Sequence, residues 1–257
     1  MDIIHVILLS LIEGITEFLP ISSTGHLILA SQLLSLPSTD FLSTFQISIQ
    51  VGAVLAVLGL YAKKLLTNPT LIIKAFIGLF PTAIVGVFAY PIIKNYLLDS
   101  TLVVAISLIL GGILIIIMEK YLFKDKSKDE NLESITYKQA LFTGLTQSIA
   151  VIPGVSRAAS SIFGGMISGL NRKTATEFSF ILALPTIMAA SGYDLLKTAP
   201  SFTQNEILYL ILGIILSFIF ALISIKWLIK YVSSHNFTSF GWYRIIIGLI
   251  FLIIGLN

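Results

Sequence analysis

The sequence predicts an all-α integral membrane protein in which about six transmembrane helices accompany two re-entrant helix hairpins that meet near the bilayer midplane. Hydrophobic residues make up 56% of the 257 residues and charged residues only 11%, whereas soluble domains carry about 25% charged residues. The mean hydropathy is +0.97, and apolar runs of roughly 20 residues recur along the whole chain. A short motif also occurs twice, which predicts an inverted-topology repeat.

The first hairpin is predicted from a polar interruption in an apolar stretch. Residues Ile3 to Ile12 are apolar, but the segment LIEGITEFLPISSTGH, from Leu11 to His26, separates them from the apolar run Leu27 to Leu36. Neither apolar piece is long enough to span a bilayer by itself. The pattern fits a helix, a break near Pro20 and Ser22, and a second helix that returns to the same side.

Three longer apolar runs follow and are predicted to cross the membrane: Phe45 to Leu60, Ile72 to Ile93 and Leu102 to Met118. The second run contains Pro81 and several glycines, which predicts a kink or a break in that helix. Lys120 to Glu133 is the only sustained charged segment of the sequence. We expect it to form a solvated loop.

The second part of the chain begins as the first part does. The segment LIEGITE begins at Leu11, and the similar segment LFTGLTQ begins 130 residues later, at Leu141. The two share a leucine, a glycine and a threonine at the same positions, and both end in a glutamate or its amide counterpart, glutamine. A polar break that contains proline follows in both parts, PISSTGH in one and PGVSRAASS in the other. Three apolar runs come next: Thr174 to Leu195, Ile207 to Leu228 and Tyr243 to Ile254. Three crossings between equivalent elements place the two parts in opposite orientations.

The sequence is therefore predicted to be a single membrane domain with a first half at 1–118, a cytoplasmic linker at 119–136 and a second half at 137–257. Basic residues crowd on one side of this arrangement: Lys63, Lys64, Lys74, the cluster from Lys120 to Lys138, Arg172, Lys173, Lys226 and Lys230. Only Lys94 and Lys197 fall on the other side. The positive-inside rule makes the crowded side cytoplasmic, so the first hairpin opens at the outer face of the plasma membrane and the second enters from the cytoplasm.

Two further features of the composition exclude classes of function. The formal net charge of +3 is too small to indicate a nucleic-acid partner. The chain has no cysteine, which excludes disulfides, thiol catalysis and thiolate metal sites.

Ionisable residues expected at membrane depth are few: Glu13, Glu17, His26, Arg157 and Glu177. Each costs roughly 2.5–3.5 kcal/mol to insert, so such residues are usually paired, hydrated and functional. Glu13 and Glu17 share one face of a helix and would repel each other unless a cation, a proton or Arg157 lies between them. Alternatively, they pair with Arg157 only to hold the hairpins together. We expect Glu177 either to have a structural role or to support the residues of the site from behind.

Three consecutive hydroxyl residues, Ser22, Ser23 and Thr24, mark the start of the returning helix. Any one of them is a good N-cap, and the free amides at a helix start also form a ready site for phosphate. His26 lies one turn after Ser23 and is in reach of its hydroxyl or of a bound phosphate. The alternative is a neutral histidine that bonds a backbone carbonyl.

The second hairpin supplies residues of complementary charge. PGVSR contains Ser156 and Arg157, and the hydroxyls of Ser160 and Ser161 follow. An arginine suits bidentate binding of phosphate oxygens. Gln50, inside an apolar run, either binds a ligand or bonds between helices.

Three motifs together resemble one family: EGITEFLPISSTGH, PGVSRAASSIFGGMISGLNRKTATEFSF and IQVGAVLAVL. They are similar to those of the undecaprenyl-diphosphate phosphatase family associated with bacitracin resistance, and the resemblance covers nearly the whole chain. It implies a membrane enzyme that removes the terminal phosphate of a polyprenyl diphosphate lipid and so regenerates the lipid carrier for cell-wall polymers. It also implies a divalent cation, Mg²⁺ or Ca²⁺, a site open toward the outer face of the membrane and, commonly, a homodimer.

The resemblance implies roles for particular residues. It assigns the acidic motif to Glu13 and Glu17, which would take part in catalysis or ligate the cation, and the basic motif to Ser156 and Arg157. The hydroxyl and histidine motif falls on Ser22, Ser23, Thr24 and His26. The family commonly reads SRSGAT after its PG, so Ser161 replaces a threonine hydroxyl here, but Ala158 cannot replace the serine.

The mechanism stays open at the level of the sequence. Arg157, the amides of Ser23 and Thr24 and the cation would hold the diphosphate. The nucleophile is Ser23 with His26 as base, His26 itself, or water. A transporter or lipid flippase for a phosphorylated or anionic substrate is the alternative function, because inverted repeats with broken helices are typical of transporters. The cluster of Ser22, Ser23 and His26 favours phosphate chemistry.

Overall fold

The computed structural model describes residues 1–92, 100–122, 131–198 and 202–255. Within these ranges the chain is helical and contains no strand. Lys94, the side chain of Lys197 and residues 123–130 of the charged segment, all used above to predict orientation or a loop, lie outside the description.

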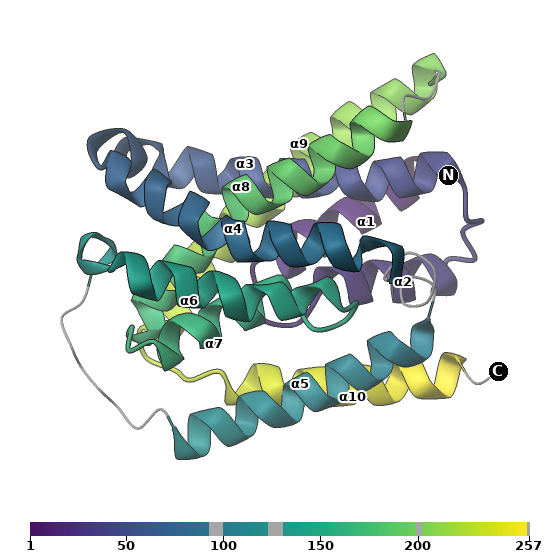
Figure 1. The fold of residues 1–257 in the computed structure, drawn as a ribbon. Coiled ribbons are helices and arrows are strands. Elements are labelled where there is room, and N and C mark those ends of the chain that lie inside the picture. The colour runs from purple at the N-terminus through teal and green to yellow at the C-terminus, as the bar shows by residue number, and fades with distance from the viewer. Residues whose placement is uncertain (93–99, 123–130, 199–201, 256–257) are drawn as a thin grey trace.

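Ten α-helices and two short 3₁₀ helices make up the described ranges (Figure 1). The helices are α1 Ile3–Thr16, α2 Ser23–Leu33, α3 Asp40–Thr67, α4 Pro69–Ile92, α5 Thr101–Tyr121, η2 Leu132–Ser134, α6 Tyr137–Gln147, η3 Ser148–Val151, α7 Arg157–Ile167, α8 Arg172–Thr198, α9 Gln204–Val232 and α10 Thr238–Gly255. Five of them, α3, α4, α5, α8 and α9, are long and apolar enough to cross a membrane. The predicted class, an all-α multi-pass membrane protein, is confirmed. The sixth predicted span corresponds to α10, a shorter apolar helix.

The two predicted polar breaks separate pairs of short helices. α1 ends at Thr16 and α2 begins at Ser23, so the chain breaks around Pro20 and Ser22 as predicted. The second break separates α6 and η3 from α7. In contrast, α4 is continuous through Pro81, which excludes the break there, while the alternative of a kink stays a prediction. Neighbouring helices in a membrane protein satisfy the groups that a proline frees.

Each short helix pair packs its first helix closely against a long helix of the other half of the chain. A methyl group on Gly14 of α1 would lie 2.7 Å from the carbonyl oxygen of Ser217 in α9. A methyl group on Gly144 of α6 would lie 1.9 Å from the carbonyl oxygen of Gly78 in α4. Only glycine permits such approaches of two backbones. The two halves are therefore interlocked.

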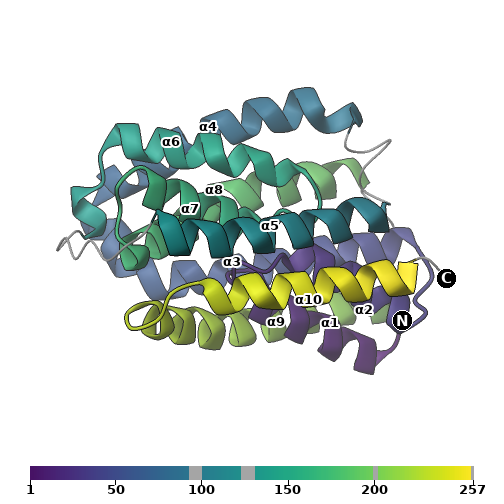
Figure 2. The ribbon, with the colours of Figure 1, turned by 90° about the horizontal axis from the view of Figure 1, so that it is seen from below.

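Both chain termini lie at one end of the molecule, and the α7–α8 and α9–α10 turns lie at the opposite end (Figures 1 and 2). The last turns of α3, α5 and α9, which also end there, carry Lys64, Lys120 and Lys230. α8 begins at that end with Arg172. Basic residues thus gather at the end away from the termini.

Candidate active site

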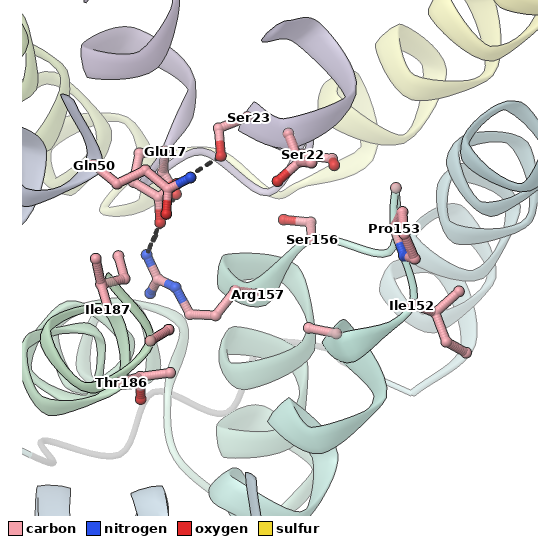
Figure 3. Close-up of a pocket in the computed structure, with 14 residues that line it drawn as sticks. Glu17, Ser22, Ser23, Gln50, Ile152, Pro153, Ser156, Arg157, Thr186 and Ile187 are labelled. Atoms are coloured by element: carbon pink, nitrogen blue, oxygen red, sulfur yellow. Dashed lines mark hydrogen bonds and ion pairs between the residues drawn. The ribbon is translucent and has the colours of Figure 1, made fainter. Parts of the chain in front are cut away.

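A cavity of about 230 Å³ lies where the two polar breaks meet (Figure 3). Its polar lining contains seven residues that the sequence predicts for the site: Glu17, Ser22, Ser23, Thr24, Gln50, Ser156 and Arg157. Apolar and small residues complete the lining: Ala150, Ile152, Pro153, Gly154, Thr186, Ile187 and Ala190. The structure therefore brings together residues from both halves of the chain.

The carboxylate of Glu17 joins the two halves of the site. The Ser23 hydroxyl donates to Oε2 of Glu17 at 2.5 Å, and Nη2 of Arg157 forms an ion pair with Oε1 at 2.7 Å. Figure 3 shows the guanidinium pointing toward the carboxylate. Only 7% of the Glu17 side chain is exposed, so water screens this pair weakly. Because the Glu17 carboxylate accepts the hydrogen bond of the Ser23 hydroxyl, it is placed to take the proton of that hydroxyl as a base.

Arg157 is held by more than this ion pair. Its Nη1 donates to the backbone carbonyl of Ser179 in α8 at 3.0 Å, and the guanidinium lies over the ring of Phe18, 5.5 Å from its centroid. Its Nε is buried without a hydrogen-bond partner. An unpaired N–H of a buried guanidinium is a donor that an anion in the cavity can use.

The two helices that follow the breaks start in the same unusual way. Ser22 and Ser156 are N-caps with positive φ angles, 73° and 79°. Each side-chain oxygen accepts a bond from the amide three residues on, from Gly25 at 3.4 Å and from Ala159 at 3.1 Å. Positive φ costs a non-glycine residue about 1–3 kcal/mol and is typical of functional sites. The starts of α2 and α7 thus both contribute to the cavity lining, where helix N-termini favour anions.

His26 does not line the cavity. Its Nδ1 lies 2.7 Å from the carbonyl oxygen of Ser22, and because a carbonyl only accepts, Nδ1 carries the proton. In the neutral ring Nε2 then accepts from the hydroxyl of Tyr243, 2.8 Å away. This is the alternative that the sequence left open, a histidine satisfied by a backbone carbonyl. The hydroxyl of Ser23 has Glu17, and not His26, as its partner.

Comparison with known proteins identifies the family. The family model described as "Bacitracin resistance protein BacA" matches residues 6–250. An undecaprenyl-diphosphatase of Wolinella succinogenes is 49% identical over 253 residues, which cover 98% of both chains. Those of Aquifex aeolicus and Persephonella marina are 48% and 47% identical and cover 95% or more of each chain. This chain belongs to the bacitracin resistance protein family.

Glu13, the other acidic residue of this family member's first motif, is fully buried, and neither carboxylate oxygen has a hydrogen-bond partner. It lies one helical turn before Glu17. Oxygen ligands of this kind suit Mg²⁺ or Ca²⁺, and Mg²⁺ commonly uses one or two carboxylates together with substrate phosphates. The described residues contain no group of three or more acidic, histidine or cysteine side chains that could hold a metal by itself. Glu17 lines the cavity, whereas Glu13 is not among the lining residues. A cation at the cavity would therefore have Glu17 as its lining carboxylate, with Glu13 next to it in α1 and the substrate phosphates as further ligands.

Ser161 lies behind the site of this family member and does not line its cavity. Its hydroxyl donates to the backbone carbonyl of Arg157 at 2.9 Å and lies 2.6 Å from the hydroxyl of Ser179. Ser161 and Ser179 thus support the start of α7 and the Arg157 side chain. Sequence reasoning missed Ser179, and it also missed Tyr243 and Arg244, which adjoin each other in α10.

Proposed function

We propose that this protein hydrolyses undecaprenyl diphosphate, or a closely similar polyprenyl diphosphate, to the monophosphate and inorganic phosphate. The reaction would recycle the lipid carrier for cell-wall polymers in the plasma membrane. The observation that carries the proposal is the arrangement of three residues in one cavity between two helix starts. Ser23 supplies a hydroxyl, Glu17 a base and Arg157 a positively charged guanidinium. Membership of the family, with relatives named undecaprenyl-diphosphatase, supports the substrate.

The contacts support Ser23 as the nucleophile. Its oxygen attacks the terminal phosphorus, its proton passes to Oε2 of Glu17, and the lipid monophosphate leaves. Glu17 gives this proton to the departing lipid monophosphate and is a carboxylate again. Water then attacks the phosphoserine, and Glu17 takes a proton from the water and passes it to the Ser23 oxygen as the P–O bond to serine breaks. This step releases inorganic phosphate and restores the hydroxyl. Arg157 and the amides at the starts of α2 and α7 stabilise the charge that develops on the phosphoryl oxygens. His26, bonded on both ring nitrogens, holds the start of α2.

A divalent cation fits this site through the carboxylates of Glu13 and Glu17. The bound cation would neutralise negative charge on the diphosphate. Glu13 supports this assignment because its buried carboxylate lies close to that of Glu17 and accepts no hydrogen bond from any other described residue.

The proposed membrane arrangement is an inverted repeat with two re-entrant hairpins. The order of α1–α5 recurs in α6–α10, and the Ser22 and Ser156 caps share one geometry. The basic end of the molecule would be cytoplasmic. The α1–α2 hairpin then enters from outside, and the site opens toward the outer face. A homodimer remains part of the proposal, to be checked by the mass of the detergent-solubilised protein.

Phosphate release from undecaprenyl diphosphate by purified protein with Mg²⁺ in detergent tests the function. We expect release by the unchanged protein and at least a hundredfold loss in Ser23→Ala and Arg157→Ala. Ser43→Ala, which removes an exposed hydroxyl at the start of α3, is the matched control and should keep full activity. If the pure protein releases no phosphate but moves the lipid across liposome membranes, the transporter alternative replaces this proposal.

A further inference from the structure

Arg244 in α10 is a fully buried arginine that does not line the cavity but bonds the backbone of both polar breaks. Its guanidinium donates to five backbone carbonyls, those of Leu108, Pro20, Val155, Ser107 and Gly154, at 3.4, 3.2, 3.0, 3.1 and 2.9 Å. An arginine side chain has five N–H donors. The number of bonds equals the number of donors, so the group is saturated.

The acceptors come from three separate segments. Pro20 belongs to the break between α1 and α2, Gly154 and Val155 belong to the break before α7, and the other two acceptors belong to α5. Nη1 alone bonds Pro20 and Val155, so a single nitrogen joins the two breaks. α5 and α10 lie side by side (Figures 1 and 2), which supplies a fixed base for this contact.

The acceptors also occupy matching places relative to the site. Pro20 and Gly154 each lie two residues before an N-cap serine, Ser22 and Ser156, whose positive φ angles shape the cavity. A peptide unit is planar and trans, so turning the Val155 carbonyl toward Arg244 turns the N–H of Ser156 the opposite way. The guanidinium therefore sets the orientation of the backbone that leads into α7.

Arg244 is built into the fold at some cost. No carboxylate among the described residues pairs with it, and only carbonyl dipoles compensate its buried charge. A methyl group on Gly111 of α5 would lie 2.2 Å from Nη2, so glycine is required to make room. The neighbouring residue, Tyr243, bonds Nε2 of His26 and so holds the start of α2.

We propose that Arg244 is a positioning residue that fixes the two breaks relative to each other, and thereby brings Ser23 and Glu17 of one half to Arg157 of the other. The part of this proposal that is tested by kcat rests on the proposed function, the hydrolysis of the lipid diphosphate. α10, which contributes no lining residue to the cavity, then belongs to the active site. Misplacement of reacting groups by about 1 Å can cost a hundredfold in rate.

Arg244→Lys tests this proposal because it keeps the charge but supplies three donors instead of five. We expect kcat to fall about 10- to 100-fold with a smaller change in KM. Hydrogen exchange measured by mass spectrometry should rise in residues 18–26 and 152–160 and stay unchanged in the long helices. An even rise through all helices, or an unchanged kcat, would overturn the proposal, since either result makes Arg244 a general stabiliser.

Two glycine substitutions at the contact of α5 with α10 give a matched pair of variants. They also test the positioning role if Arg244→Lys fails to fold. Gly111→Ala places its methyl 2.2 Å from Nη2 of Arg244, whereas Gly248→Ala places its methyl 2.6 Å from Cγ1 of Ile109 and 2.9 Å from the carbonyl oxygen of Ala105, with no Arg244 atom among the nearest contacts. Both should lower the Tm, but only Gly111→Ala should lower kcat and raise exchange at the breaks. Equal effects of the two on kcat would contradict positioning.

The exchange measurement separates this inference from the proposed function. If the unchanged protein releases no phosphate, the proposed function fails, while exchange confined to the breaks of Arg244→Lys still supports the positioning role. If the unchanged protein releases phosphate but hydrogen exchange in Arg244→Lys does not rise at the breaks, the positioning role is wrong and the proposed function still stands.

Discussion

Glu17 contacts both the proposed nucleophile, Ser23, and the proposed phosphate-binding residue, Arg157. One carboxylate oxygen accepts the Ser23 hydroxyl and the other pairs with Arg157. Removing its charge therefore removes the base for Ser23 and leaves a buried guanidinium without its counter-charge.

We expect Glu17→Gln, which keeps the shape of the side chain, to lower kcat by about 10²–10⁴-fold, the usual contribution of a general base. Phosphate release from the polyprenyl diphosphate measures it. Glu206→Gln, at an exposed helix start, removes a carboxylate away from the cavity and should leave kcat unchanged. Activity of Glu17→Gln within tenfold of the unchanged protein would exclude Glu17 as the base.

The identity of the nucleophile leads to a second prediction at this scale. Since Ser23 lines the cavity and His26 does not, acid quenching during turnover of a substrate labelled in its terminal phosphate should trap phosphoserine at Ser23. Peptide mapping locates the label. A phosphohistidine at His26 would instead require its ring to leave Ser22 and Tyr243 before reaction.

Among the elements, α5, α8 and α10 are joined at the basic end by a buried carboxylate. Glu119, with 1% of its side chain exposed, accepts from Arg172 at 2.7 Å and from the backbone amide of Phe237 at 3.0 Å. We expect Glu119→Ala to lower the free energy of unfolding by about 3 kcal/mol, at the low end for a broken buried pair because Arg172 keeps some access to water. The Tm in detergent measures this change, with Lys120→Ala, at the exposed neighbouring position, as control.

The interlocking of helices gives a further prediction. Gly144→Ala forces α6 away from the backbone of α4, whereas Gly86→Ala in α4 meets nothing within 4 Å. Overpacking typically costs about 1–3 kcal/mol. The Tm should fall in the first variant and hold or rise slightly in the second. Equal Tm values would show that α4 and α6 can separate freely.

The sequence predicted the helices better than it predicted the contacts between them. Apolar length and polar breaks located the ends of α4, α5, α8 and α9 to within four residues, because both follow from local composition. α3 begins five residues before and ends seven residues after its predicted run. Six of the cavity residues were predicted from the chemistry of two motifs, and Gln50 was predicted from its place inside an apolar run. The pairing of Ser23 with Glu17, and not His26, depends on how the break folds, which residue spacing does not specify. Arg244 was missed because a single arginine near the start of an apolar run resembles an interfacial residue until its five acceptors are visible.

The whole molecule has its basic helix ends opposite its termini (Figures 1 and 2). A membrane-crossing orientation follows from this arrangement and can be tested cleanly, because the chain has no cysteine of its own. Single cysteines at Asp2, near the N-terminus, and at Lys230, in the last turn of α9, mark the two ends. Each replaces a residue outside the cavity.

In intact cells, a membrane-impermeant maleimide should label Asp2→Cys, whereas Lys230→Cys should react only after the membrane is opened. Phosphate release by both variants confirms that labelling reports on the folded enzyme. The reverse labelling pattern would place the α1–α2 hairpin, and with it Ser23 and Glu17, on the cytoplasmic side. The site would then receive lipid diphosphate from inside the cell, and the proposed outward-facing reaction would be wrong even though the chemistry at Ser23 stayed the same.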